Sequence, residues 1–180
     1  MLLLKCILTI SFLLTATSMA AQTATSKAST DFVTVCEVLG SRGAYDGKFV
    51  ALIGRWSPTE EGVWLKSDCA NQVKTGDYVW KNIIFLKYDP SSPSVFSNGP
   101  DLDVEVANRK IAEIDGSNAS RKEERGWAVV YGRIETKENL RTVVGRDGKP
   151  RPAGYGHLSG APAQLVYREK DFVTLPRAGY

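Results

Sequence analysis

Five short runs of strand-forming residues constrain the fold of this chain more than any other feature. They span residues 48–56, 62–67, 81–88, 126–137 and 162–175. Glycine, proline, serine and aspartate fill the gaps, as is typical of β-sheet proteins. The third run is apolar enough to predict burial on both faces. Gly54 and Gly132 lie inside the first and fourth runs, where we expect bulges or bends in a curled sheet.

Two helical segments accompany the strands. Residues 32–39 have apolar side chains at helical spacing before Gly40, and residues 102–114 place theirs on one side of a helix. The order is helix, three strands, helix, two strands, which is the order of a five-stranded OB-fold. We predict a mainly β fold with minor α content. It is one OB-fold-like barrel over residues 31–180, with an N-terminal helix and a helix between strands 3 and 4. A meander sheet packed on a helix is the alternative.

The first twenty residues predict a secretory signal peptide. The apolar run from Cys6 to Leu14 is too short to span a bilayer, and Ser18 and Ala20 fit the small positions before a cleavage site. An uncleaved N-terminal anchor is the alternative. Residues 21–30 are small and polar, which predicts a flexible lead-in. We therefore expect a periplasmic or secreted protein with no transmembrane anchor after signal cleavage.

Two cysteines remain after the signal segment, Cys36 and Cys69. In an exported chain such a pair predicts a disulfide bond, with two buried free thiols or half of a metal site as alternatives. Structural zinc sites use closely spaced cysteine pairs, which this chain lacks. We expect neither a metal site nor a cofactor.

The only histidine, His157, lies in the segment AGYGHLSG, two residues before Ser159. A nucleophilic serine needs a histidine that accepts its proton and a third group that orients the histidine. Neighbours in sequence rarely have that geometry, and the chain lacks a GxSxG motif. We expect His157 to fasten the loop by a hydrogen bond, and a small hydrolase using His157 is an alternative. The glycines of this segment, Gly154, Gly156 and Gly160, suit tight turns or close approaches.

The long loop between the fourth and fifth strands, residues 138–161, is the strongest candidate for binding. OB-folds bind ligands on the face of strands 2 and 3, between the loops that join strands 1–2 and 4–5. The candidate ligand-binding residues are Trp56, Trp64, Arg141, Arg146, Lys149, Arg151, Tyr155 and His157. Cations beside aromatic rings suit a nucleic acid, a glycan or an acidic peptide. Alternatively, Trp56 and Trp64 pack in the core and the cations only solvate the loop. Trp80 and Trp127 are predicted to be packing residues.

Several short motifs resemble uncharacterised exported bacterial proteins with a predicted OB-fold-like β-barrel. They are Tyr-Asp-Gly-Lys-Phe-Val-Ala-Leu-Ile-Gly at 45–54, Glu-Gly-Val-Trp-Leu at 61–65, Cys69, Gly-Tyr-Gly-His-Leu at 154–158 and Ala-Gln-Leu-Val at 163–166. The resemblance implies a fold and an export route, and it supplies no catalytic residues.

We therefore predict a non-catalytic binding module with a protein or glycan partner in the cell envelope. The 23 basic and 20 acidic residues of the chain are nearly balanced, and export also argues against a nucleic-acid partner. A structural cell-envelope protein is the remaining alternative.

Overall fold

The computed structural model describes residues 31–92, 103–115, 126–137 and 139–175. The predicted signal peptide and lead-in lie outside these ranges. Within the ranges, no helix has both the length and the apolar character needed to cross a membrane.

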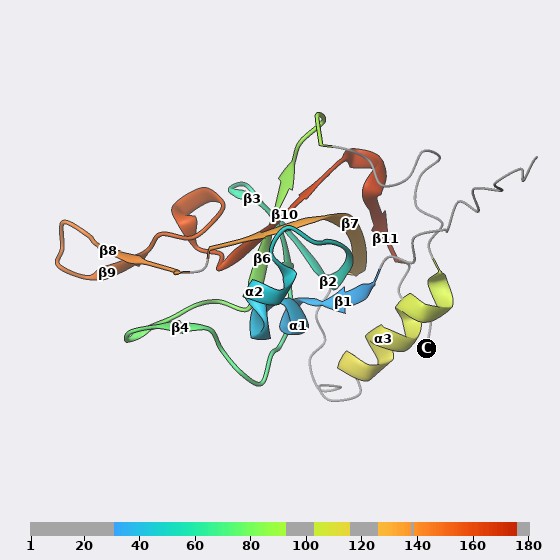
Figure 1. Ribbon diagram of the computed structural model, residues 1–180, viewed down its shortest axis with the longest axis horizontal. Coiled ribbons are helices and arrows are strands. Elements are labelled where there is room, and N and C mark those ends of the chain that lie inside the picture. Colours follow the sequence, from blue (N-terminus) through green and yellow to red (C-terminus); the bar gives the residue numbers. More distant parts are fainter. Residues whose placement is uncertain (1–30, 93–102, 116–125, 138, 176–180) are drawn as a thin grey trace, which may run out of the picture.

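Five strands close into a barrel, which confirms the predicted fold class (Figure 1). They are β2 (Phe49–Thr59), β3 (Gly62–Lys66), β6 (Ile83–Tyr88), β7 (Trp127–Thr136) and β10 (Ala163–Tyr167). The strands are paired in the order β2-β3-β6-β10-β7, and β7 pairs again with β2. Only β6 and β10 run parallel among these barrel pairs. The third and fifth barrel strands are thus neighbours, and the closed barrel is OB-fold-like.

Shorter elements surround the barrel. They are β1 (Phe32–Thr34), α1 (Val35–Gly40), α2 (Arg42–Tyr45), β4 (Lys74–Thr75), β5 (Tyr78–Val79), α3 (Val104–Asp115), β8 (Thr142–Val144), β9 (Pro150–Pro152), η1 (His157–Ser159), η2 (Glu169–Asp171) and β11 (Phe172–Thr174). The pairs β4–β5 and β8–β9 form separate two-stranded sheets. β1 and β11 extend the main sheet by pairing with β2 and β7.

Three sequence predictions differ from the structure in detail. The first helix begins at Val35 instead of residue 32, because Phe32–Thr34 pair in parallel with β2. The third barrel strand is buried on one face only: Ile84 and Leu86 are buried, whereas Ile83 and Phe85 on the other face are only partly buried. The predicted fifth strand is interrupted by η2, after which β11 pairs with β7 farther along the same edge that β10 uses.

Alternating side chains of the barrel strands build two cores. Val50 and Leu52 of β2 face the barrel interior, and buried side chains of α1 pack into the same cluster. Ala51 and Ile53 of β2 face outward and pack with Ala107 of α3 in a second cluster. The predicted helix between strands 3 and 4 therefore forms, and it covers the outer face of β2. The N-terminal helix α1 is the one that packs against the interior.

The two glycines inside strands mark close approaches instead of bulges. β2 and β7 pair continuously through both Gly54 and Gly132. A Cβ atom at Gly54 would lie 2.9 Å from both Leu65 Cβ and Val35 Cγ2, and one at Gly132 would lie 2.8 Å from Leu165 Cδ2. Neither position has room for a side chain.

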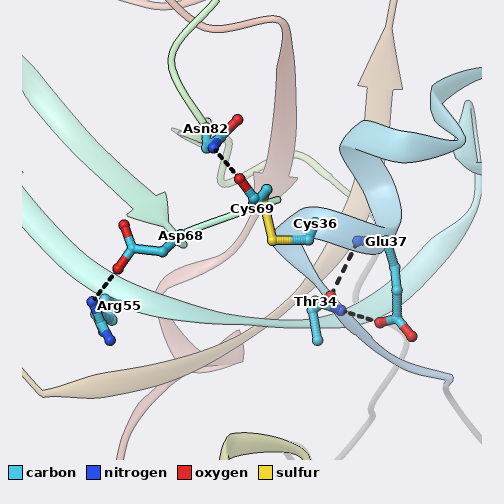
Figure 2. Close-up of a disulfide and its surroundings, with 7 residues drawn as sticks. All are labelled: Thr34, Cys36, Glu37, Arg55, Asp68, Cys69 and Asn82. Atoms are coloured by element: carbon cyan, nitrogen blue, oxygen red, sulfur yellow. Dashed lines mark hydrogen bonds and ion pairs between the residues drawn. A yellow bond between two sulfur atoms is a disulfide. The ribbon is translucent and has the colours of Figure 1, made fainter. Parts of the chain in front are cut away.

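The predicted disulfide between Cys36 and Cys69 is confirmed, so free thiols and half a metal site are excluded at these positions (Figure 2). The bond joins α1 to the segment that follows β3, with 5.3 Å between the two Cα atoms. Asn82 Nδ2 donates to the carbonyl oxygen of Cys69 at 3.4 Å. The buried Arg55 forms an ion pair with the neighbouring Asp68 at 3.1 Å.

A capping box fixes the start of α1 beside the disulfide (Figure 2). The Thr34 hydroxyl accepts from the Glu37 backbone N–H at 3.1 Å, and Glu37 Oε2 accepts from the Thr34 N–H at 2.7 Å. Burial raises the pKa of Glu37, but the hydrogen bonds from Thr34 and the charge of Lys110 outweigh it and lower the pKa. Lys110 Nζ lies 3.4 Å from Glu37 and thereby links α3 to α1.

Replacing both disulfide cysteines by serine should lower the free energy of unfolding by about 3–4 kcal/mol. The bond closes a loop with a sequence separation of 33 residues and so restricts the unfolded chain. Urea unfolding followed by circular dichroism measures the change. Reductant should destabilise the wild-type protein by a similar amount and leave the double variant unchanged. Equal stability of the fully reduced and oxidised wild-type protein would contradict a structural role of the bond.

Candidate functional site

The loop between β7 and β10 has two parts with different roles. Residues 141–152 form a hairpin from β8 and β9, which we call the hairpin arm. Residues 153–161 fold back onto the barrel, and we call them the covering loop. The hairpin arm projects from the barrel on the same side as the β4–β5 hairpin (Figure 1). Both parts begin at the barrel end where β7 ends and β10 starts.

The hairpin arm has one basic face. Because strand side chains alternate, Arg141, Val143, Lys149 and Arg151 share a face, on which Val143 stands opposite Arg151. The other face carries Thr142, Val144, Pro150 and Pro152. Val143 is 53% exposed and Val144 is 78% exposed. The arm therefore presents its cations together with Val143 on one face, and Val144 with two prolines on the other.

The tight turn of the arm contains one acidic residue, Asp147, which pairs with only one of the four cations of the arm. The Gly145 N–H donates to the Lys149 carbonyl at 2.9 Å, and Gly148 takes the positive φ of 73° that such a turn requires. Asp147 in the turn lies 3.5 Å from Arg151. The other three cations of the arm form no ion pair with another described residue; they are Arg141, Arg146 and Lys149.

The two edges of the arm differ in their hydrogen-bonding capacity. The inward-pointing backbone groups belong to pairs 141–153 and 145–149, so the groups of Thr142 and Val144 on β8 point outward. On β9 the outward positions are Pro150 and Pro152, which have no N–H. The neighbouring β5 lies against β9. The free edge with donors is therefore that of β8.

The covering loop occupies the barrel face that OB-folds use for ligands. A Cβ atom at Gly156 would lie 2.7 Å from Trp64 Cη2 and 2.8 Å from Phe85 Cδ2, so the backbone of Gly156 rests on both rings. Trp64 is only 8% exposed, and its Nε1 donates to Thr59 Oγ1 at 3.3 Å. The geometry favours a packing role for Trp64 over the predicted ligand platform.

Lys137 and backbone hydrogen bonds hold the covering loop in place. Lys137 Nζ donates to the carbonyl oxygens of Ala153 and Gly154 at 3.0 and 3.1 Å and lies 4.9 Å from the centre of the Tyr155 ring. Tyr155 and Ala161 exchange backbone hydrogen bonds. Tyr155 is thus a packing residue of the loop. Burial, followed by the charges of Glu135 and Asp46, raises its pKa to about 12.

His157 lies on the exposed tip of the covering loop. Its side chain forms no hydrogen bond with any described residue, so the backbone and Lys137 do the fastening expected of His157. Leu158 and Ser159 follow with positive φ angles of 60° and 52°, and Leu158 is 69% exposed. The structure does not place the Ser159 hydroxyl in a hydrogen bond with His157. Within the described ranges, no cluster of three or more His, Cys, Asp or Glu side chains could hold a metal ion.

The eight predicted binding residues therefore do not form one site. The cations share the hairpin arm, while Tyr155, His157 and Trp64 belong to the covering loop and the surface beneath it. Trp56 lies at the other end of the barrel, with its ring 5.8 Å from that of Phe172. Trp80 is fully buried and Trp127 half-buried, as expected of packing residues. The alternation of side chains along β8 and β9 is the sequence signal that would have predicted an arm with two different faces.

Comparison of the chain with protein-family models, curated proteins and solved structures finds no match. The resemblance to exported bacterial proteins thus remains an expectation. The function of the protein has to be inferred from the chemistry of its own surface.

Two glycines of the covering loop provide a matched pair of variants. Gly156→Ala should lower the free energy of unfolding by about 1–3 kcal/mol, because φ 76° and ψ −177° suit glycine alone and the methyl group would meet Trp64. Gly160→Ala should change it by less than about 0.5 kcal/mol, because Gly160 has φ −82° and open space around it. The prediction of a tight approach therefore holds for Gly156 and not for Gly160. Urea unfolding compares the two, and equal losses would contradict this account.

Tyr155 should make the protein less stable in alkali. Its folded pKa of about 12 exceeds the ordinary value of 10.0, so the folded state retains a proton that the unfolded chain loses. The stability linked to this proton is complete below pH 10 and falls as the pH rises towards 12. Unfolding measured on either side of pH 10 should show a smaller loss for Tyr155→Phe than for wild type. An identical loss in both proteins would show that Tyr155 does not contribute.

Proposed function

We propose that the protein is an exported, non-catalytic binding module that binds an acidic segment of a partner protein through its hairpin arm. The observation that carries the proposal is the basic face of the arm, formed by Arg141, Lys149 and Arg151 on an exposed hairpin. The disulfide supports an oxidising location, periplasmic or secreted.

The backbone of the arm supports an extended binding partner. The outer edge of β8 carries unpaired N–H and C=O groups at Thr142 and Val144, onto which a strand can add. Strand addition supplies main-chain hydrogen bonds, and neighbouring side chains supply selectivity. Exposed Val143 and Val144 offer apolar contact to alternate side chains of such a strand.

Charge then selects which extended segment binds. Arg141 and Lys149 have no described ion-pair partner, and Asp147 offsets only part of the positive charge. Exposed cations attract acidic segments over a range of about 10 Å at moderate salt. The binding should therefore weaken as the salt concentration rises.

The alternatives have weaker support. The hydrolase alternative requires a histidine in contact with a nucleophile, whereas His157 has no hydrogen bond to a described residue. A structural envelope role gives no reason for a free strand edge beside unneutralised cations. An anionic glycan has the same charge as an acidic peptide, but it has no peptide backbone that could pair with β8. A variant of the β8 edge therefore distinguishes the two ligands.

The triple variant Arg141→Gln, Lys149→Gln and Arg151→Gln should bind a fluorescent peptide rich in Glu and Asp about tenfold more weakly than wild type. Three exposed ion pairs are lost, each contributing roughly 0.2–1 kcal/mol. Fluorescence anisotropy at two salt concentrations measures the affinity. A control variant with glutamine at Lys81, Lys87 and Arg109 loses the same charge from other exposed positions and should bind like wild type.

A second variant tests the strand edge without changing the charge. Thr142→Pro removes an outward N–H of β8. It should weaken binding of the acidic peptide and leave binding of a sulfated glycan unchanged. Equal binding by the triple variant and its control would contradict the proposed site. Equal loss of peptide and glycan in Thr142→Pro, or tighter binding of the glycan by wild type, would contradict a peptide partner.

A further inference from the structure

A second surface, at the opposite end of the barrel from the hairpin arm, forms a hollow lined by aromatic rings. The hollow has a volume of about 410 Å³, within the range of about 300–1,000 Å³ for small-molecule sites. It is lined by Trp56, Val63, Tyr88, Tyr167, Glu169 and Phe172. Strands β6 and β10 end here, so we call the hollow the barrel mouth.

The lining residues of the barrel mouth continue the interior face of the barrel. Trp56 lies four residues beyond the buried Leu52, and Tyr88 and Tyr167 each lie two residues beyond a buried leucine. Phe172 pairs with Val130, another interior residue. Trp56, Tyr167 and Phe172 pack against the interior core but remain partly exposed. The mouth is therefore where the barrel core meets solvent.

The rings form inclined walls around the mouth. The planes of Trp56 and Phe172 meet at 65°, those of Tyr88 and Tyr167 at 66°, and those of Tyr167 and Phe172 at 45°. A flat ligand stacks best on one ring or between parallel rings, whereas inclined rings surround a rounded group. Ring faces carry partial negative charge and attract cations within about 6 Å.

The one charged group at the mouth also favours a cation, as the ring faces do. Glu169 is the one charged side chain among the described residues that line it. Its carboxylate acts on the neighbouring ring: burial first, and then the charge of Glu169, raises the pKa of Tyr167. Arg168 and Lys170 line an adjoining hollow, which shares Tyr88 and Glu169 with the mouth, and do not line the mouth itself.

We propose that the barrel mouth binds an organic cation with apolar substituents, of which a trimethylammonium group is the simplest form. The methyl groups would contact the inclined rings of Trp56, Tyr167 and Phe172, and Glu169 would balance the charge at the rim. This site is separate from the hairpin arm, and neither proposal depends on the other.

The test compares choline with 3,3-dimethylbutan-1-ol, its neutral isostere, on the full chain. Indole N–H signals in ¹⁵N NMR spectra report the site: the Trp56 signal should shift, while that of the buried Trp80 should not. Choline should bind about three- to tenfold more tightly than the isostere, because only the cation interacts with the ring faces. Equal or tighter binding of the isostere would show an apolar site and overturn the proposal.

Two variants at the mouth locate the interaction. Glu169→Gln removes the carboxylate and keeps the shape, and Tyr88→Ala removes a wall that is 52% exposed. Each should weaken choline binding about three- to tenfold, and Glu169→Gln should leave the isostere unchanged. Glu105→Gln, on the exposed side of α3, is the matched control and should bind like wild type.

Other outcomes overturn the proposal. Choline that shifts no indole signal at concentrations that would saturate a millimolar site excludes the cation. Glucose that shifts Trp56 more strongly than choline makes the mouth a sugar site. Wild-type choline affinity in Glu169→Gln and Tyr88→Ala places the ligand elsewhere. Wild-type-like spectra of the variants without ligand establish that their fold is intact.

Discussion

The pairing of β2 with two other barrel strands, β7 and β3, holds the barrel together. Its first part pairs with β7 over Phe49–Arg55, and its last part pairs with β3 over Arg55–Thr59. Gly54 lies next to the point where the second partner joins, and the absence of a side chain there lets β3 and α1 approach. A methyl group at this position would separate the elements that close the barrel. The close packing of β2, β3 and α1 therefore depends on one residue without a Cβ atom.

Closure of the barrel also separates the two candidate binding surfaces. The connection from β7 to β10 leaves one end of the barrel, while β6 and β10 finish at the other end. The basic hairpin arm belongs to the first end, and the aromatic mouth to the second. The closed, hydrogen-bonded barrel lies between them. The two surfaces differ in charge, with exposed cations on the arm and one carboxylate at the mouth, so a single ionic group does not suit both.

Local patterns predicted the barrel strands and the disulfide, because short apolar runs and paired cysteines in a chain with a predicted export signal have few other uses. Local patterns gave the wrong secondary structure where pairing with a distant strand determines it. Phe32–Thr34 fit a helix by spacing, yet they gain hydrogen bonds as a strand beside β2. The sequence predicted the exposed cations of the arm, because charged residues in loops usually face solvent. The covered state of Trp64 was not predictable, since it depends on Gly156 folding back from a distant part of the chain.

The asymmetry of the hairpin arm argues for a foreign strand over a second copy of this chain. An exposed strand edge promotes self-association unless charges or prolines prevent it. On β9, Pro150 and Pro152 remove the outward donors, whereas β8 keeps them at Thr142 and Val144. Two β8 edges that met would place two positively charged arms side by side, and like charges repel. Positive charge thus disfavours self-pairing at the β8 edge, and the same charge suits the acidic strand that we propose as the partner.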